Sequence, residues 1–297
     1  MAKQLVLFFY NSDSFSHASF DLIHSDIWGS SPTATVGGSK YFVIFVDDFS
    51  RYTWIYFMRN RSELAQIYRT FAQMIYTQFS KTIKIFCTNN AMEYRDSQFF
   101  DFIHTQGTII QRSCAGTSQQ NGRAKRKHHH IFDSVRDFHI SASCPESFLG
   151  KAALTVVYTI NRLPSSALQN VTPFKRLYST PASYSSLCVF GCACFVLLQP
   201  HKHFKLEPRS RLCCFLGYGI EHKGYRCWDP ISQRLCISHH VVFWEHTTFN
   251  SLSKFKTCST PSFFTNPSLP LFPHAISPAD SLVSPLAPPL AVDPILD

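Results

Sequence analysis

A chain of 297 residues that is 45% hydrophobic and 16% charged is long enough for one large or two modest domains, and this composition excludes a wholly disordered chain. Lysine and arginine number 28 against 19 aspartates and glutamates, a surplus that favours polyanionic partners such as nucleic acid. Neither a secretory signal nor an apolar run of the roughly 18–20 residues that a membrane span needs is visible, so we expect a soluble, intracellular protein.

After a polar N-terminal segment over residues 1–19, the chain predicts an α/β arrangement. Strands are expected where β-branched and aromatic residues gather, at 20–28, 41–49, 52–58, 83–88 and 108–112. Helices are expected where apolar residues recur at helical spacing, at 62–79, 97–106, 123–139 and 145–161. Three consecutive strands followed by alternating helices and strands predict a mixed sheet with flanking helices, which we assign to a domain over 20–180.

The pattern changes after this domain. Short strands separated by Gly and Pro turns predict a small β-barrel over residues 188–246. The segment 250–297 holds nine of the 17 prolines and many serines, so we predict a disordered linker there.

The eleven cysteines do not form the paired C-x-x-C units that are typical of a zinc site. Their closest spacings are Cys192-x-Cys194 and the adjacent pair Cys213-Cys214. We interpret them as small apolar residues of strands in a reducing compartment, with a metal site as the less favoured alternative.

Several short motifs occur in a specific order. They include His24-Ser25-Asp26, Asp47-Asp48-Phe49-Ser50-Arg51, Gln119-Gln120-Asn121-Gly122, Asn161-Arg162-Leu163-Pro164 and, further on, Phe215-Leu216-Gly217-Tyr218 and Lys223-Gly224-Tyr225. Together they resemble the integrase region of copia-type retrotransposon Pol polyproteins over about residues 3–246. The resemblance implies a ribonuclease H-like fold with a mixed five-stranded sheet and flanking helices, followed by an SH3-like barrel.

The chemistry that this resemblance implies is DNA strand transfer by two Mg²⁺ or Mn²⁺ ions held by three acidic side chains. The first acid corresponds to Asp26. The second belongs to a family pattern like S-D-N-G-x-E-Y, but here the sequence reads T-N-N-A-M-E-Y and places Asn89 at that position. The third belongs to a pattern like Q-Q-N-G-x-A-E-R-K, where this chain has Lys125.

The spacing indicates that these two acids are substituted rather than misaligned. Thirty-five residues separate Asn89 from Lys125, as between the second and third acids of the family. The three positions carry formal charges of −1, 0 and +1, which cancel. Since two unit charges ~4 Å apart interact by about 4 kcal/mol at an effective dielectric constant of about 20, Lys125 would repel a metal ion there. We therefore expect two-metal catalysis to be lost, although Glu93, Asp96 or Asp133 are conceivable replacement ligands.

The start of the helix expected at 123–139 is strongly basic. We predict DNA contacts for Gln119, Asn121, Arg123, Arg126 and Lys127, with a solvated helix face as the alternative. On this hypothesis, removing Lys127 would reduce the salt dependence of DNA binding. The three histidines at 128–130 cannot converge on a metal, because neighbouring helical residues point about 100° apart. Asp47 and Asp48 point to opposite sides of a strand, so we expect capping or pairing at the hairpin rather than a catalytic pair.

The sequence as a whole predicts an integrase-type DNA-binding protein that is catalytically defective and acts in the nucleus, without a membrane partner and with a homo-oligomer possible. The alternatives are an active strand transferase with unusual ligands and a non-functional product of a decayed element. Family members carry a zinc-binding domain before the core and a reverse transcriptase region after it, and neither is visible in this sequence.

Overall fold

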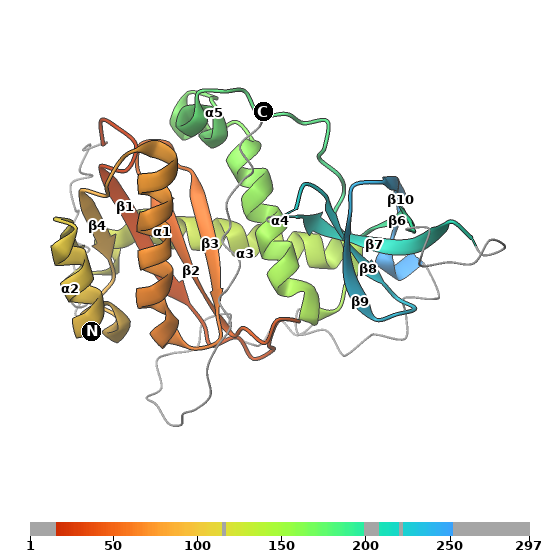
Figure 1. The fold of residues 1–297 in the computed structure, drawn as a ribbon, viewed down its shortest axis with the longest axis horizontal. Coiled ribbons are helices and arrows are strands. Elements are labelled where there is room, and N and C mark those ends of the chain that lie inside the picture. Colours follow the sequence, from red (N-terminus) through yellow and green to blue (C-terminus); the bar gives the residue numbers. More distant parts are fainter. Residues whose placement is uncertain (1–15, 115–116, 199–207, 220–221, 252–297) are drawn as a thin grey trace, which may run out of the picture.

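The computed structural model describes residues 16–114, 117–198, 208–219 and 222–251. These residues form two five-stranded sheets with helices around and between them (Figure 1). The linker predicted for 250–297 lies outside the described residues from 252 onward, and so does the N-terminal segment up to residue 15.

The first sheet has the strand order β3-β2-β1-β4-β5. Its strands are β1 (Leu22–Trp28), β2 (Tyr41–Asp47), β3 (Thr53–Met58), β4 (Ile85–Thr88) and β5 (Ile109–Arg112). Strands β1, β2 and β3 pair antiparallel, whereas β4 runs parallel to β1 and to β5. The mixed five-stranded sheet predicted from the sequence is therefore confirmed.

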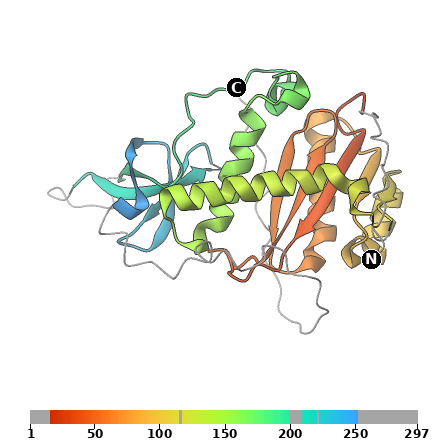
Figure 2. The ribbon, with the colours of Figure 1, turned by 180° about the vertical axis from the view of Figure 1, so that it is seen from behind.

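Helices cover both faces of this sheet. They are α1 (Leu64–Phe79), α2 (Ser97–Thr105), α3 (Gly122–Ala142), α4 (Leu149–Arg162) and α5 (Pro173–Tyr178). Helices α1 and α2 lie on one face, and the long α3 crosses the other and reaches the second sheet (Figure 2). Because side chains alternate along a strand, Val43 and Phe45 of β2 pack toward α1, while Phe42 and Ile44 pack toward α3 and α4.

Two details of the helices differ from the sequence prediction. Helix α5 was not expected, although its start carries a recognisable signal: Thr172 accepts a hydrogen bond from the Lys175 amide, and Pro173 occupies the first turn. Helix α4 begins at Leu149 rather than at Pro145, because a 3-10 turn over Glu146–Phe148 comes first.

The second sheet is entirely antiparallel, with the order β10-β6-β7-β8-β9. Its strands are β6 (Cys192–Leu197), β7 (Ser210–Tyr218), β8 (Tyr225–Asp229), β9 (Arg234–Ser238) and β10 (Val241–Thr248). Strand β9 ends at Ser238 and β10 begins at Val241, and β10 pairs with β6 instead of β9. No Gly or Pro marks this break, so the sequence offered no turn signal.

The two sheets share a core through α4. Phe148 and Ala152 pack in one cluster with Cys214, Leu216 and Trp228 of the second sheet. At Gly217, whose φ is +111°, a Cβ atom would collide with the side chain of Thr155, so the close approach of β7 to α4 requires glycine. None of the helices in the described ranges has the length and apolar character of a membrane span.

The prediction that the cysteines are small apolar residues of strands holds for most of those described, but Cys114, Cys144 and Cys188 lie outside the strands, and Cys114 is exposed. Ten of the eleven are described, and all ten are free thiols. Five of them, Cys192, Cys194, Cys213, Cys214 and Cys227, are buried in the second sheet and pack as small apolar side chains.

Candidate functional site

The carboxyl end of β4 brings Asn89 against Asp26. Strands β1 and β4 run parallel with Ser25 beside Thr88, so the residue that follows each of these partners lies at the same edge of the sheet. The Asn89 amide nitrogen lies 2.6 Å from Oδ1 of Asp26. The two positions that the family resemblance assigned to metal-binding acids are therefore in direct contact.

Both carboxylate oxygens of Asp26 accept hydrogen bonds from protein groups. Oδ1 accepts from the Asn89 side chain and, at 3.1 Å, from the Ile27 amide. Oδ2 lies 3.0 Å from Nδ1 of His128 on α3. Because a carboxylate only accepts, Nδ1 must be the protonated ring nitrogen of His128 in this contact. The Asn89 carbonyl oxygen is turned away and accepts from the Ala91 amide.

Helix α3 sets the position of the third assigned residue. Asn121, Lys125 and His128 are spaced three and four residues apart, so they share one side of the helix. Asn121 is buried and donates to the Ser25 carbonyl oxygen at 2.8 Å, and His128 is buried against Asp26. Lys125 lies between them and is exposed to solvent.

The contact between His128 and Asp26 was not anticipated from the sequence. The signal was nevertheless present, because His128 follows Lys125 by three residues and must lie on the same side of α3. The ring is enclosed by Phe42 and Phe132, with centroid distances of 5.3 and 6.3 Å. His128 thus reaches the first assigned acid from the helix that carries the third position.

A second polar cluster surrounds the buried Asp48, next to β1. Its carboxylate lies 3.0 Å from Nε2 of His24 and 3.4 Å from Nη1 of Arg51, and it also forms an ion pair with Arg123. Burial, followed by the charges of Arg123 and Arg51, lowers the pKa of His24 to about 3. The imidazole is therefore neutral at pH 7, and the Asp48 carboxylate contacts two guanidinium groups.

The adjacent Asp47 has a separate structural role. It accepts hydrogen bonds from the Ser50 amide and hydroxyl at 2.9 and 2.6 Å and from the Phe20 amide at 2.8 Å. The expectation that one of the two aspartates caps or pairs at the hairpin is confirmed for Asp47.

The five residues predicted to contact DNA occupy different surroundings. Gln119 and Arg126 are exposed, whereas Asn121 is buried against β1 and Arg123 is engaged with Asp48. Lys127 lies half-buried between α3 and α4. The structure therefore leaves Gln119 and Arg126, together with the exposed Lys125, on the accessible surface at the start of α3.

The acids considered as replacement ligands are engaged or distant. Oε1 of Glu93 lies 2.8 Å from Arg61, and Asp96 caps α2 by accepting from the Phe99 amide at 3.1 Å. Asp133 is exposed, two turns beyond Lys125 on α3. Within the described ranges, no group of three or more His, Cys, Asp or Glu side chains is placed to hold a metal ion.

The three consecutive histidines point into different surroundings, as their helical spacing predicted. His128 faces Asp26, His129 is exposed, and His130 lines the space between α3 and α4.

Comparison with known families identifies two segments of the chain. Residues 16–118 match the family model described as the integrase core domain. Residues 192–258 match the model described as the retroviral polymerase SH3-like domain. The resemblance drawn from the sequence motifs is confirmed by these matches.

Relatives of this chain include Pol polyproteins of plant retrotransposons. The chain is 35% identical over 251 residues to the retrovirus-related Pol polyprotein from transposon TNT 1-94 of Nicotiana tabacum, covering 84% of this chain and 19% of the relative. It is 37% identical over 226 residues to the corresponding polyprotein from transposon RE1 of Arabidopsis thaliana, covering 76% of this chain and 15% of the relative. The chain thus spans less than a fifth of the length of either polyprotein.

Two viral structures are similar at 14% sequence identity. The catalytic core domain of HTLV-2 integrase in complex with magnesium gives a TM-score of 0.40 over 52% of this chain and 95% of that chain. The simian T-cell lymphotropic virus intasome in complex with the PP2A regulatory subunit B56 gamma gives a TM-score of 0.44 over 76% of this chain and 77% of that chain.

Proposed function

Because this chain belongs to the integrase core family of retrotransposon Pol polyproteins, we propose that it binds DNA through the start of α3 but does not catalyse strand transfer. One observation carries the second half of this proposal. The two oxygens of Asp26 accept hydrogen bonds from Asn89 and His128, so the side chains around this carboxylate are donors where a pair of metal ions would need further acidic oxygen ligands.

The donor set around Asp26 does not fit a pair of magnesium ions. Magnesium requires oxygen ligands at about 2.0–2.1 Å in near-octahedral geometry. At this site Asn89 presents its NH₂ group and His128 its N–H group, both of which are hydrogen-bond donors. Lys125 adds a positive charge on the same side of α3. We therefore propose no magnesium-dependent reaction step for this chain.

DNA binding is supported by the charge at the start of α3. The first turn of this helix contains no acidic residue, and Arg123, Lys125 and Arg126 follow one another closely. Cations are disfavoured at the positive end of a helix dipole, whereas a phosphate group is favoured there. A DNA phosphate near this turn would offset both the helix dipole and the side-chain charges.

The DNA-binding half of the proposal is tested by the salt dependence of binding. Each phosphate contact contributes about −0.9 to the slope of log K against log salt concentration for duplex DNA. We expect Lys125→Ala and Arg126→Ala each to reduce the steepness by about that amount. Lys81→Ala, which removes an exposed lysine beyond the end of α1, is the matched control. Equal slopes for all three variants and the wild type would contradict the proposal.

The catalytic half is tested by a DNA-end joining assay in magnesium. We expect no joined product from the wild-type chain. Product that disappears in Asp26→Asn would instead support the alternative, an active strand transferase with unusual ligands. The engaged positions of Glu93 and Asp96 count against that alternative. A chain that neither binds DNA nor joins it, yet folds, would leave the product of a decayed element as the remaining interpretation.

We further propose that such binding takes place in the nucleus, where chromosomal DNA is found.

A further inference from the structure

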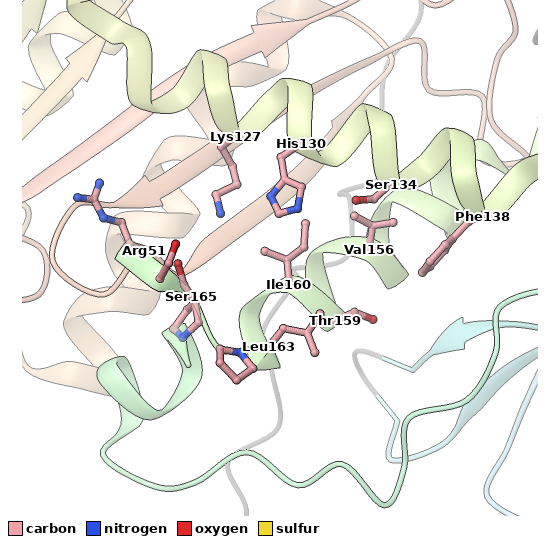
Figure 3. Close-up of a pocket in the computed structure, with 13 residues that line it drawn as sticks. Arg51, Lys127, His130, Ser134, Phe138, Val156, Thr159, Ile160, Leu163 and Ser165 are labelled. Carbon is pink, nitrogen blue, oxygen red and sulfur yellow. The ribbon is translucent and has the colours of Figure 1, made fainter. Parts of the chain in front are cut away.

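A groove of about 430 Å³ lies between α3 and α4 (Figure 3). This volume falls within the roughly 300–1,000 Å³ that is common for small-molecule sites. Its α3 side consists of Lys127, His130, Ser134 and Phe138, which are spaced three and four residues apart and so form one stripe along the helix. His128, which contacts Asp26, belongs to a different side of α3.

The groove has a cationic end and an apolar end. Arg51 from the β2–β3 turn, Lys127 and His130 line one end, where Figure 3 shows the Lys127 amine pointing into the space between the helices and the Arg51 guanidinium directed away from it. Burial lowers the pKa of His130, so its imidazole is neutral at pH 7 and can donate a hydrogen bond there. Phe138, Val156 and Ile160 supply apolar surface further along. Hydroxyl groups of Thr159, Ser165 and Ser166 complete the polar lining, and no aspartate or glutamate lines the groove.

Lys127 is the strongest indication of a missing partner. It is half-buried, and the described residues offer its amine neither a hydrogen bond nor an ion pair. Burial and the nearby charge of Arg51 lower its pKa to about 8. Arg51 and Arg123 both contact the Asp48 carboxylate. The folded chain thus holds an uncompensated cation whose cost an anion would offset.

We propose that this groove binds a small phosphate monoester of an apolar group. The phosphate would lie against Lys127 and His130, with the charge of Arg51 nearby, and the apolar group would lie along Phe138 and Ile160. A phosphate monoester carries a charge of about −1.5 to −2 at pH 7, which matches more than one cation, whereas a carboxylate carries only one charge. Serine hydroxyls at the cationic end add neutral donors for the remaining phosphate oxygens.

The arrangement fits a small molecule better than a DNA backbone. A DNA phosphate needs cations that reach out of the surface, as the exposed Lys125 and Arg126 do. Apolar surface continuous with the cations adds nothing to backbone binding, but it contributes about 25 cal/mol per Å² buried for an organic group. This inference does not depend on DNA binding by the chain.

The test uses 1-naphthyl phosphate as the probe, with 1-naphthol and inorganic phosphate as the two halves of the same molecule. Calorimetric titration of the full chain at pH 7 gives the three dissociation constants. We expect the monoester to bind at least about tenfold more tightly than either half, since 1-naphthol lacks the charged contacts and inorganic phosphate lacks the apolar contacts. Equal affinity for the monoester and for either half would overturn the proposal.

Variants assign the binding to the groove. We expect Lys127→Met to weaken binding of the monoester by about tenfold or more and Lys127→Arg to retain most of the affinity. The exposed control, Lys81→Met, should leave the affinity unchanged. Unchanged binding in Lys127→Met, or the same loss in Lys81→Met, would contradict the inference. Displacement of the probe by duplex DNA would show that the groove belongs to the DNA surface and would also overturn it. A chain that binds the monoester but not DNA would refute only the proposed function.

Discussion

The two faces of helix α3 differ in whether their charged side chains have partners. On the face toward β1, His128 and Asn89 satisfy Asp26, and Arg123 is paired with the buried Asp48. On the face toward α4, Lys127 lies in a groove without any acidic residue in its lining. On one side of the helix, neighbouring side chains pair the buried carboxylates, whereas on the other side no acidic side chain among the described residues that line the groove balances the charge of Lys127.

This difference has an energetic meaning. A buried polar group that finds hydrogen-bond partners in the chain contributes to stability, whereas a buried charge without a partner reduces it. Substitutions on the face toward β1 are therefore expected to destabilise the fold. Removing the charge on the groove face is expected to stabilise it.

The largest effect is expected from Asp48→Asn. This change removes the carboxylate that balances Arg51 and Arg123, and breaking a buried ion pair from one side costs about 3–5 kcal/mol. The free energy of unfolding from urea titration measures the loss. Asp101→Asn, on the exposed surface of α2, is the control and should stay within about 0.5 kcal/mol of the wild type. A similar small change for both variants would show that the stability of the fold does not depend on the ion pairs of Asp48 on the face toward β1.

A smaller loss is expected from Asn89→Asp. The donor that now contacts Asp26 at 2.6 Å would become a second carboxylate, so we expect a loss of about 2–3 kcal/mol at pH 7 without magnesium. Repulsion between the two carboxylates raises a folded-state pKa above its unfolded value. Stability is then present at low pH and lost as the pH rises through that pKa, so the deficit should shrink on acidification.

The neighbouring Asn90→Asp is the matched control for this prediction. Asn90 is exposed and accepts from Arg95, so a carboxylate there gains a cationic partner instead of meeting another acid. Equal unfolding free energies for the two variants across the pH range would show that Asn89 does not stabilise Asp26.

The smallest effect has the opposite sign. Lys127→Met should raise the free energy of unfolding by about 1–2 kcal/mol at pH 7, a value reduced for the partial exposure of the side chain. The pKa of Lys127 is lowered by burial, and then by Arg51, from 10.5 to about 8. The folded state therefore loses this proton at lower pH than the unfolded state, and wild-type stability rises between about pH 8 and pH 10.5. The advantage of the variant should be constant below pH 8 and should fade above it.

Denaturant titrations at several pH values test this sign. Lys127→Arg, which keeps the charge, should not gain stability at pH 7. A loss of stability in Lys127→Met would mean that the amine has a stabilising partner, and the contrast between the two faces would disappear.

The sequence predicted the parts of the fold that depend on local patterns. The stripe of Leu64, Ile67, Tyr68 and Phe71 marked α1, and the family resemblance assigned Asn89 and Asp26 to one site, where the structure brings them into contact. The sequence could not predict the ion pair between Arg123 and Asp48, because the two residues are far apart in the chain. In addition, Arg51 of the hairpin could pair with the same carboxylate. The groove was missed for a similar reason: its lining comes from the hairpin, two helices and the segment around Ser165, and no single motif contains it.

A magnesium titration of thermal stability tests most directly whether the site around Asp26 binds magnesium. A ligand that binds only the folded state raises Tm in a saturable way. We predict no saturable rise for the wild-type chain and a clear rise for Asn89→Asp/Lys125→Glu, which restores the two acids. A saturable rise in Tm of the wild type that Asp26→Asn abolishes would show that the unchanged site binds magnesium, contrary to the proposal.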